Sequence, residues 1–240
     1  MSNPFSYSQL RKTRLAKATR PFLARGILQK RCSKCLLAEV CCICQWKKSV
    51  TTELDIILLM HTDEILKPTN TGRLISDVLP DNCFAFEWSR TEPDPDLLKL
   101  LNDPNRDIVI IYPTQENRVT YRYQAGVKND KKLTLLVLDG TWRQSKKIFN
   151  LSEWLQKFPT FELNVHTQAN YGLRKAPHAN QLSTAEATAV ALAQANELTA
   201  AKVLDNYFSI FNHHYSASRS NKPPQQTQAH VELNSDPNND

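Results

Sequence analysis

Five cysteines within thirteen residues form the densest group of reactive side chains in the sequence. Four of them follow the spacing C-x2-C-x6-C-x-C, at Cys32, Cys35, Cys42 and Cys44, and Cys41 is a neighbour. Thiolates repel one another unless a cation neutralises them, and Zn²⁺ accepts four in a tetrahedron with bonds of ~2.3 Å. We therefore predict a structural zinc site with these four ligands. Cys41 could replace Cys42 by a one-residue shift, and a redox-active or unfilled cluster is the alternative.

A second chemical group follows an apolar run in the middle of the chain. Leu133–Leu138 has the length and aliphatic content of a buried strand, Asp139-Gly140 is a strong turn signal, and a helical pattern begins at Thr141. Asp139 thus lies at the carboxyl end of a strand, where open α/β sheets bind ligands. A carboxylate placed there is a candidate for a catalytic group. The plainer alternative is a simple turn, with Trp142 plugging the core.

The elements that must position these groups alternate between strands and helices. The expected strands are Leu54–Met60, Asn82–Trp88, Asp107–Tyr112, Leu133–Leu138 and Thr160–Val165. Expected helices are Ser8–Thr19, Arg73–Leu79, Leu97–Asn102, one from Thr141, an alanine-rich one after Ser183, and Val203–Tyr215. The polar stretch Gln115–Lys132 reads as a loop or hairpin. This alternation predicts an α/β fold with a mainly parallel sheet.

Two of these helices carry capping signals. Asn70 or Thr71 could cap the helix that begins near Arg73, and Ser183 with Glu186 fits a capping box. The amino-terminal amides of the helix Arg73–Leu79 would then face the ligand edge of the sheet. A purely structural cap explains both signals equally well.

Composition narrows the class of protein. The chain is 41% hydrophobic and 22% charged, as a globular protein is, and no apolar run is long enough to span a bilayer. There is no secretory signal, so we expect a cytoplasmic protein with no membrane contact. Only five scattered glycines occur, which excludes a G-x-G-x-x-G fingerprint or a P-loop.

Charge is concentrated at the amino terminus. The first 38 residues carry nine Lys or Arg side chains and no acidic residue. Such a segment is either a solvated leader or a surface for nucleic-acid phosphates. We predict RNA contacts by Arg11, Lys12, Arg14, Lys17 and Arg20. The expected division is a basic arm (1–30), a zinc-binding cysteine segment (31–50), an α/β catalytic domain (51–215) and a disordered, apolar-poor tail (216–240).

Several short motifs occur in an order that resembles the DTW-domain family over roughly residues 31–200. They are the cysteine pattern, His61-x-x-Glu64, Asn70-Thr71-Gly72-Arg73-Leu74, Asp139-Gly140-Thr141-Trp142, Tyr171-x-x-Arg174-Lys175 and Ser183-Thr184-Ala185-Glu186-Ala187. Members look like bacterial tRNA-uridine aminocarboxypropyltransferases. The resemblance implies a SPOUT-like, possibly knotted α/β fold that binds S-adenosylmethionine in loops at strand ends.

The resemblance also implies a reaction and a site. The 3-amino-3-carboxypropyl group of S-adenosylmethionine would move to N3 of a tRNA uridine, expected in the variable loop, leaving S-methyl-5'-thioadenosine. Asp139 would act as a base or orient the amino group of the cofactor, and Arg174 and Lys175 would bind RNA phosphate or, for Arg174, the cofactor carboxylate. The implied cofactor-binding residues are Asn70, Thr71, Arg73, Leu138, Asp139, Thr141, Trp142, Ser183, Thr184 and Glu186.

Two other function classes fit the same sequence. A SPOUT-like RNA methyltransferase would use the same cofactor but transfer its methyl carbon. A non-enzymatic zinc-containing RNA-binding protein would need only the cysteines and the basic arm. In each case the expected partner is RNA, and no obligate protein partner is implied.

Overall fold

The fold was analysed in a computed structural model. It describes residues 3–18, 29–113, 116, 118–123, 130–164, 173, 182–220 and 222–235, and the statements below concern these residues. Within them, no helix is both long enough and apolar enough to cross a membrane.

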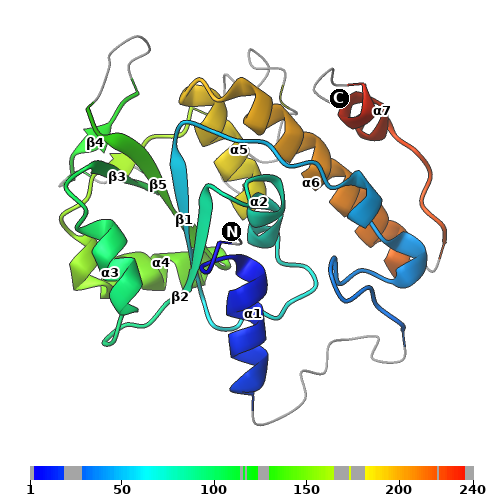
Figure 1. Ribbon diagram of the computed structural model, residues 1–240, viewed down its shortest axis with the longest axis horizontal. Helices are drawn as coiled ribbons and strands as arrows, with labels where there is room; N and C mark the ends of the chain where they lie inside the picture. Colours follow the sequence, from blue (N-terminus) through cyan, green and yellow to red (C-terminus); the bar gives the residue numbers. More distant parts are fainter. Residues whose placement is uncertain are drawn as a thin grey trace.

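A parallel sheet of six strands, in the order β2-β1-β5-β3-β6-β4, forms the centre of the molecule (Figure 1). The strands are β1 (Asp55–Met60), β2 (Cys83–Glu87), β3 (Arg106–Ile111), β4 (Thr120–Tyr121), β5 (Lys132–Asp139) and β6 (Thr160–Phe161). Every pairing between neighbouring strands of this sheet is parallel. The prediction of an α/β fold with a mainly parallel sheet is confirmed.

The central strands are buried on both faces, which explains their unbroken aliphatic sequences. In β1, Ile56, Leu58 and Met60 belong to one hydrophobic core, whereas Ile57 and Leu59 belong to another. The same alternation runs through β5. Each face of the sheet therefore has its own core.

Helices cover the two faces as separate groups (Figure 1). One core is completed by α2 (Gly72–Val78), α5 (Thr184–Gln194) and α6 (Leu198–Arg219). The other is completed by α3 (Pro95–Leu101) and α4 (Trp142–Leu151). Three short 3-10 helices also occur, at Glu39–Cys41, Cys44–Trp46 and Glu153–Leu155. We refer to the two sides as the α2/α5 face and the α3/α4 face.

The connections change direction between β1 and β5. The chain leaves β1 through α2 toward β2 at one edge, and it leaves β5 through α4 toward β6 on the other side. The two strands end level, with Met60 opposite Asp139. A crevice outside such a reversal is where open α/β sheets bind ligands.

Two predictions about the far side of the sheet need correction. The strand expected over Thr160–Val165 ends at Phe161, since the chain leaves the sheet after two paired residues. The stretch Gln115–Lys132 is not a hairpin in its described part, because β4 pairs in parallel with β6. The SPOUT-like topology and the knot stay predictions, since residues 165–172 and 174–181 lie outside the described range.

The amino-terminal segment is docked on the edge of the sheet. The basic helix expected over Ser8–Thr19 is confirmed as α1 (Tyr7–Ala16). Ahead of it, the Phe5 carbonyl accepts a hydrogen bond from Ala85 N at 2.7 Å, and Asn3 Nδ2 donates to the Cys83 carbonyl at 2.9 Å. The helix thereby holds its basic side chains beside β2.

The carboxyl-terminal prediction is wrong where the chain is described. A disordered tail was expected over residues 216–240, yet α6 continues to Arg219 and α7 (Gln228–Asn234) packs on it (Figure 1). Ala229, His230 and Leu233 are buried. His230 Nε2 lies 3.0 Å from His214 Nε2, and His214 Nδ1 lies 3.0 Å from the Cys41 carbonyl. Composition did not predict this helix, because a polar residue, His230, forms part of its buried face. His230 can be buried there because it pairs with His214.

Candidate active site and metal centre

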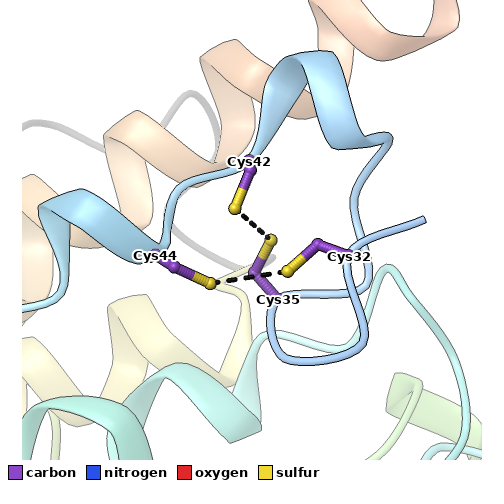
Figure 2. Close-up of side chains that lie close together, drawn as sticks. All are labelled: Cys32, Cys35, Cys42 and Cys44. Carbon is purple, nitrogen blue, oxygen red and sulfur yellow. Dashed lines mark hydrogen bonds between the residues drawn. The ribbon is translucent and has the colours of Figure 1, made fainter. Parts of the chain in front are cut away.

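Four cysteine side chains converge on one point in the segment that precedes β1 (Figure 2). The four Sγ atoms lie within 4.8 Å of one another, with Cys32 to Cys44 at 3.6 Å and Cys35 to Cys42 at 3.7 Å. A tetrahedron with Zn–S bonds of ~2.3 Å has edges of about 3.8 Å. The cluster therefore has the size of a four-sulfur metal site.

The backbone explains why Cys42 faces this point and Cys41 does not. A 3-10 helix ends at Cys41, and the chain becomes extended at Cys42, with φ −61° and ψ 133°. Cys41 Sγ lies instead 3.7 Å from the Lys222 carbonyl. On the other arm, Cys32 N donates to the Leu37 carbonyl at 2.9 Å, which closes the turn that carries Cys35. The geometry favours Cys42 over Cys41 as the fourth ligand.

Asp139 lies at the end of β5 and is almost completely enclosed, with 1% of its surface exposed. Its Oδ2 accepts a hydrogen bond from Asn70 Nδ2 at 2.6 Å, and its Oδ1 accepts one from Thr184 Oγ1 at 2.7 Å. These donors come from the starts of α2 and α5, so one carboxylate joins two helices to one strand. The carboxylate also lies where the helix dipoles favour negative charge.

Gly72 lets α2 approach this carboxylate. A Cβ at position 72 would lie 2.7 Å from Asp139 Cγ and 2.7 Å from its Oδ1. Any side chain would therefore push the helix and the strand end apart. Glycine is needed at position 72 because no space remains for a side chain next to the Asp139 carboxylate.

Capping residues fix both helix starts. Asn70 Oδ1 accepts from Arg73 N at 3.0 Å, so the same side chain caps α2 and binds Asp139. The predicted capping box of α5 is confirmed: Ser183 Oγ accepts from Glu186 N, and Glu186 Oε2 accepts from Ser183 N.

The environment of Asp139 raises the pKa of its carboxyl group. Burial raises the pKa of the Asp139 carboxyl to about 6, and the hydrogen bonds from Thr184 and Asn70 oppose that rise. Loss of hydration on burial disfavours the charged form of a carboxylate, and hydrogen bonds donated to it compensate only in part. Near neutral pH the group is mainly charged.

Thr141 and Trp142 lie apart from the group formed by Asn70, Asp139 and Thr184, which we call the Asp139 cluster. Thr141 forms a capping box with Gln144 at the start of α4, on the other face of the sheet. The Trp142 side chain is 61% exposed and stacks on Tyr112, with ring centroids 5.8 Å apart. The alternative interpretation of Trp142 as a core plug is therefore wrong.

The comparisons decide the family. The model of the DTW domain matches residues 29–216, which is most of the chain. The chain belongs to the DTW-domain family. This confirms the resemblance seen in the ordered motifs.

Curated relatives of this DTW-domain protein are named tRNA-uridine aminocarboxypropyltransferase 2. The Macaca fascicularis protein is 28% identical over 170 residues, covering 67% of this chain and 55% of the relative. The Drosophila melanogaster protein is 26% identical over 175 residues (69% and 66%), and the Mus musculus protein 26% over 168 residues (67% and 55%). The chain thus spans between about half and two thirds of these relatives. No solved structure gives a significant match. Since these relatives are animal proteins, the likeness to bacterial members stays a prediction.

Arg73 is buried inside the DTW-domain fold. Its side chain is 1% exposed, and its guanidinium lies 5.2 Å from the ring centroid of Phe211 on α6. It therefore packs between α2 and α6 and supports the helix that follows Asn70. Its role in cofactor binding stays a prediction.

The remaining predicted residues divide into three groups. Thr71 Oγ1 accepts from Ala185 N at 3.5 Å, which ties the two helix starts directly, and the Leu138 carbonyl accepts from Ser145 Oγ at 3.2 Å. Lys12 on α1 and Lys17 at its carboxyl-terminal cap are exposed, Arg11 is half-buried, and the Arg14 guanidinium is 3.6 Å from Glu87. The positions outside the described residues are Arg20, Arg174 and Lys175.

Sequence reasoning missed three residues near the carboxyl ends of β3 and β5. Gly72 was read only as part of a motif, although it contacts Asp139. Gln144 lies 3.3 Å from His61 Nδ1 as well as capping α4, and the Thr141-x-x-Gln144 spacing signals that cap. Tyr112, at the end of β3, supports Trp142, and no local pattern indicates this contact.

Proposed function

We propose that this DTW-domain protein is a tRNA-uridine aminocarboxypropyltransferase that uses S-adenosylmethionine as donor. The observation that carries the proposal is the joining of α2 and α5 to the end of β5 by Asp139, at the reversal point of the sheet. The names of the relatives supply the substrate class. Family membership links this site to those relatives.

In the proposed reaction, N3 of the uridine attacks the carbon that joins the aminocarboxypropyl group to the sulfonium sulfur. The new N3–C bond forms as the S–C bond breaks, the N3 proton is released, and sulfur leaves as the neutral thioether S-methyl-5'-thioadenosine. Three carbons are attached to the sulfonium. Which one reacts depends on which is held in line with N3 at ~3–3.5 Å.

Asp139 fits a positioning role better than a base role. Both of its oxygens already accept hydrogen bonds, and 1% of the residue is exposed, so a substrate nitrogen has no access to it in this structure. Its charge instead keeps the loops before α2 and α5 at a fixed separation. That separation would select the reacting carbon of the donor.

We assign supporting roles to the two segments that precede β1. A Zn²⁺ ion held by Cys32, Cys35, Cys42 and Cys44 would be structural, because four thiolates leave no open position. The exposed lysines of α1 would contact tRNA phosphates. The all-parallel sheet with its ligand edge supports a SPOUT-like fold, and a cytoplasmic location would suit the tRNA substrate.

The test is nucleoside mass spectrometry of an unmodified tRNA transcript after incubation with the protein and S-adenosylmethionine. We expect a uridine heavier by one aminocarboxypropyl group. A methylated uridine would overturn the reaction and favour a SPOUT-like methyltransferase. The absence of any new nucleoside would favour a non-enzymatic RNA-binding protein.

Two substitutions of one residue separate the roles of Asp139. Asp139→Ala removes both hydrogen bonds, and we expect kcat to fall about 100-fold, as misplacement of reacting groups can cause. Asp139→Asn keeps an oxygen for Asn70 and offers an N–H to the Thr184 hydroxyl, so we expect most activity to remain. A base role predicts the same loss in both variants. Asp63→Asn, which changes an exposed carboxylate in the segment after β1, is the matched control.

A further inference from the structure

A column of stacked rings reaches the surface near the carboxyl end of β5. Trp142 lies parallel to Tyr112, with centroids 5.8 Å apart and ring planes 7° apart. Tyr112 in turn lies 3.9 Å from Phe149 at 10°, and the Arg118 guanidinium is 4.2 Å from the Phe149 centroid. Tyr112 and Phe149 are buried, whereas Trp142 is 61% exposed. The outermost ring of a rigid column is therefore open to solvent.

The other three tryptophans behave differently. Trp88 is buried and donates to Ser152 Oγ at 2.8 Å, and Trp46 and Trp154 are both half-buried. Only at position 142 does the fold hold a large indole on the surface, with α4 capped immediately before it by Thr141. A ring fixed by stacking has lost its freedom before a ligand arrives, which lowers the cost of binding.

The first turns of α4 around Trp142 carry mainly positive charge, and one exposed carboxylate, Asp63, contacts Gln144 there. Arg143, Lys146 and Lys147 are exposed on the first turns of α4, and the helix contains no acidic residue. Among the described residues, none of the three pairs with a carboxylate. Aromatic rings beside unpaired basic side chains are the combination that binds single-stranded nucleic acid: bases stack on the rings, and phosphates meet the charges.

Trp142 lies on the α3/α4 face of the sheet, so it cannot be part of the Asp139 cluster. Asn70, Thr184 and Asp139 meet on the α2/α5 face, whereas Tyr112 and Phe149 belong to the core of the α3/α4 face. A donor held by the loops before α2 and α5, and a base resting on Trp142, would approach the end of β5 from opposite faces. Trp142 therefore lies apart from Asn70, Asp139 and Thr184, which the family resemblance had placed with it in one cofactor site.

We propose that the exposed face of Trp142 stacks on an unpaired nucleobase of the RNA substrate, while Arg143 and Lys146 contact the neighbouring phosphates. The proposal rests on the proposed function, because it takes tRNA as the partner. It assigns the α3/α4 face to the RNA and the α2/α5 face to the donor.

The main experiment compares Trp142→Ala, Trp142→Phe and Leu198→Ala, the last being a control that removes an exposed apolar side chain from α6. The Kd for an unmodified tRNA transcript is measured without donor, and the Kd for S-adenosylmethionine is measured by calorimetry. Loss of one stacked base weakens binding about tenfold to a hundredfold. We expect this loss for tRNA with Trp142→Ala, recovery with Trp142→Phe, and unchanged donor affinity in all variants.

Two results would overturn the proposal. One is an unchanged tRNA Kd for Trp142→Ala, and the other is a lost affinity for S-adenosylmethionine with unchanged tRNA binding, which would assign the ring to the adenine of the donor. Folding is checked by circular dichroism, and an exposed ring should be dispensable for it.

A spectroscopic measurement gives an independent readout. Addition of a short oligouridylate should quench the tryptophan fluorescence of the wild-type protein. The same addition to Trp142→Phe should leave the fluorescence of the other tryptophans unchanged although binding persists. Quenching that survives this substitution would contradict stacking at Trp142.

Failure of the proposed function is distinguishable from failure of this inference. If the wild-type protein forms no modified uridine but Trp142→Ala still weakens tRNA binding, the reaction is wrong and the RNA platform stands. If modification occurs and the tRNA Kd is insensitive to position 142, the platform is wrong and the reaction stands.

Discussion

The cysteine cluster and the Asp139 cluster are assembled in opposite ways. The four sulfurs come from thirteen consecutive residues, so local spacing alone brings them together. Asp139 meets partners that are 69 and 45 positions away in the chain, so its site exists only when the whole sheet has formed. The first site would depend on a metal ion and the second on the fold. The predictions below test that contrast, from the largest expected effect to the smallest.

Substitution Cys35→Ser should have the largest effect, because a structural Zn²⁺ contributes on the order of 10 kcal/mol to a small segment. We expect loss of bound zinc, measured by mass spectrometry of the metal, and a lower Tm. Cys41→Ser is the matched control and should keep the metal. Zinc lost from Cys41→Ser but retained by Cys42→Ser would reverse the ligand assignment.

The pH dependence of stability should report the burial of Asp139. Its native pKa of about 6 lies above the ordinary value of 3.8, so the stability that it contributes is complete below pH 4 and is lost as the pH rises through 6. A shift of about two units corresponds to about 3 kcal/mol.

Asp139→Asn should therefore gain stability relative to the wild type between pH 4 and pH 7. The difference in unfolding free energy between the two proteins, measured with denaturant at each pH, isolates this group. A difference independent of pH would mean that the carboxylate is well solvated in the native state.

Gly72→Ala should destabilise the fold by about 1–3 kcal/mol, as overpacking of a tight contact does. The new Cβ would meet the Asp139 carboxylate at 2.7 Å. The double variant Gly72→Ala with Asp139→Ala removes the clashing atoms. A double-mutant cycle should then show positive coupling, and purely additive effects would contradict a direct contact.

Ser183→Ala should cost about 1 kcal/mol, the usual value of a lost helix cap. Thermal unfolding compares it with Ser183→Asp, which keeps a capping oxygen and should stay close to the wild type. Equal losses in both variants would mean that the serine contributes something other than the cap that places Thr184.

Local patterns predicted the convergence of the four cysteines, the four longer strands and the caps of α2 and α5. Each of these depends on residues a few positions apart. For Asn70, Thr184 and Asp139, the sequence indicated only that they lie at the same edge of the sheet. Their hydrogen bonds could not be predicted, because residues far apart in the chain show no characteristic spacing.

Burial was the property hardest to predict. Arg73 carries a charge, yet it is buried with its guanidinium over the ring of Phe211. Trp142 is apolar, and a core position was one interpretation of it, yet it is exposed. Helix α7 was hidden in a polar tail because His230 is buried with a partner. Side-chain chemistry alone does not say which face of the sheet a residue meets.

The contact of Asn3 and Phe5 with β2 also bears on how the protein behaves at high concentration. An open edge strand offers unpaired amide and carbonyl groups to a second molecule and can seed aggregation. Here the amino-terminal segment occupies Ala85 N and the Cys83 carbonyl, and the opposite edge is the two-residue strand β4. A chain trimmed before Tyr7 would expose the unpaired backbone groups of β2, and we expect its first symptom to be self-association.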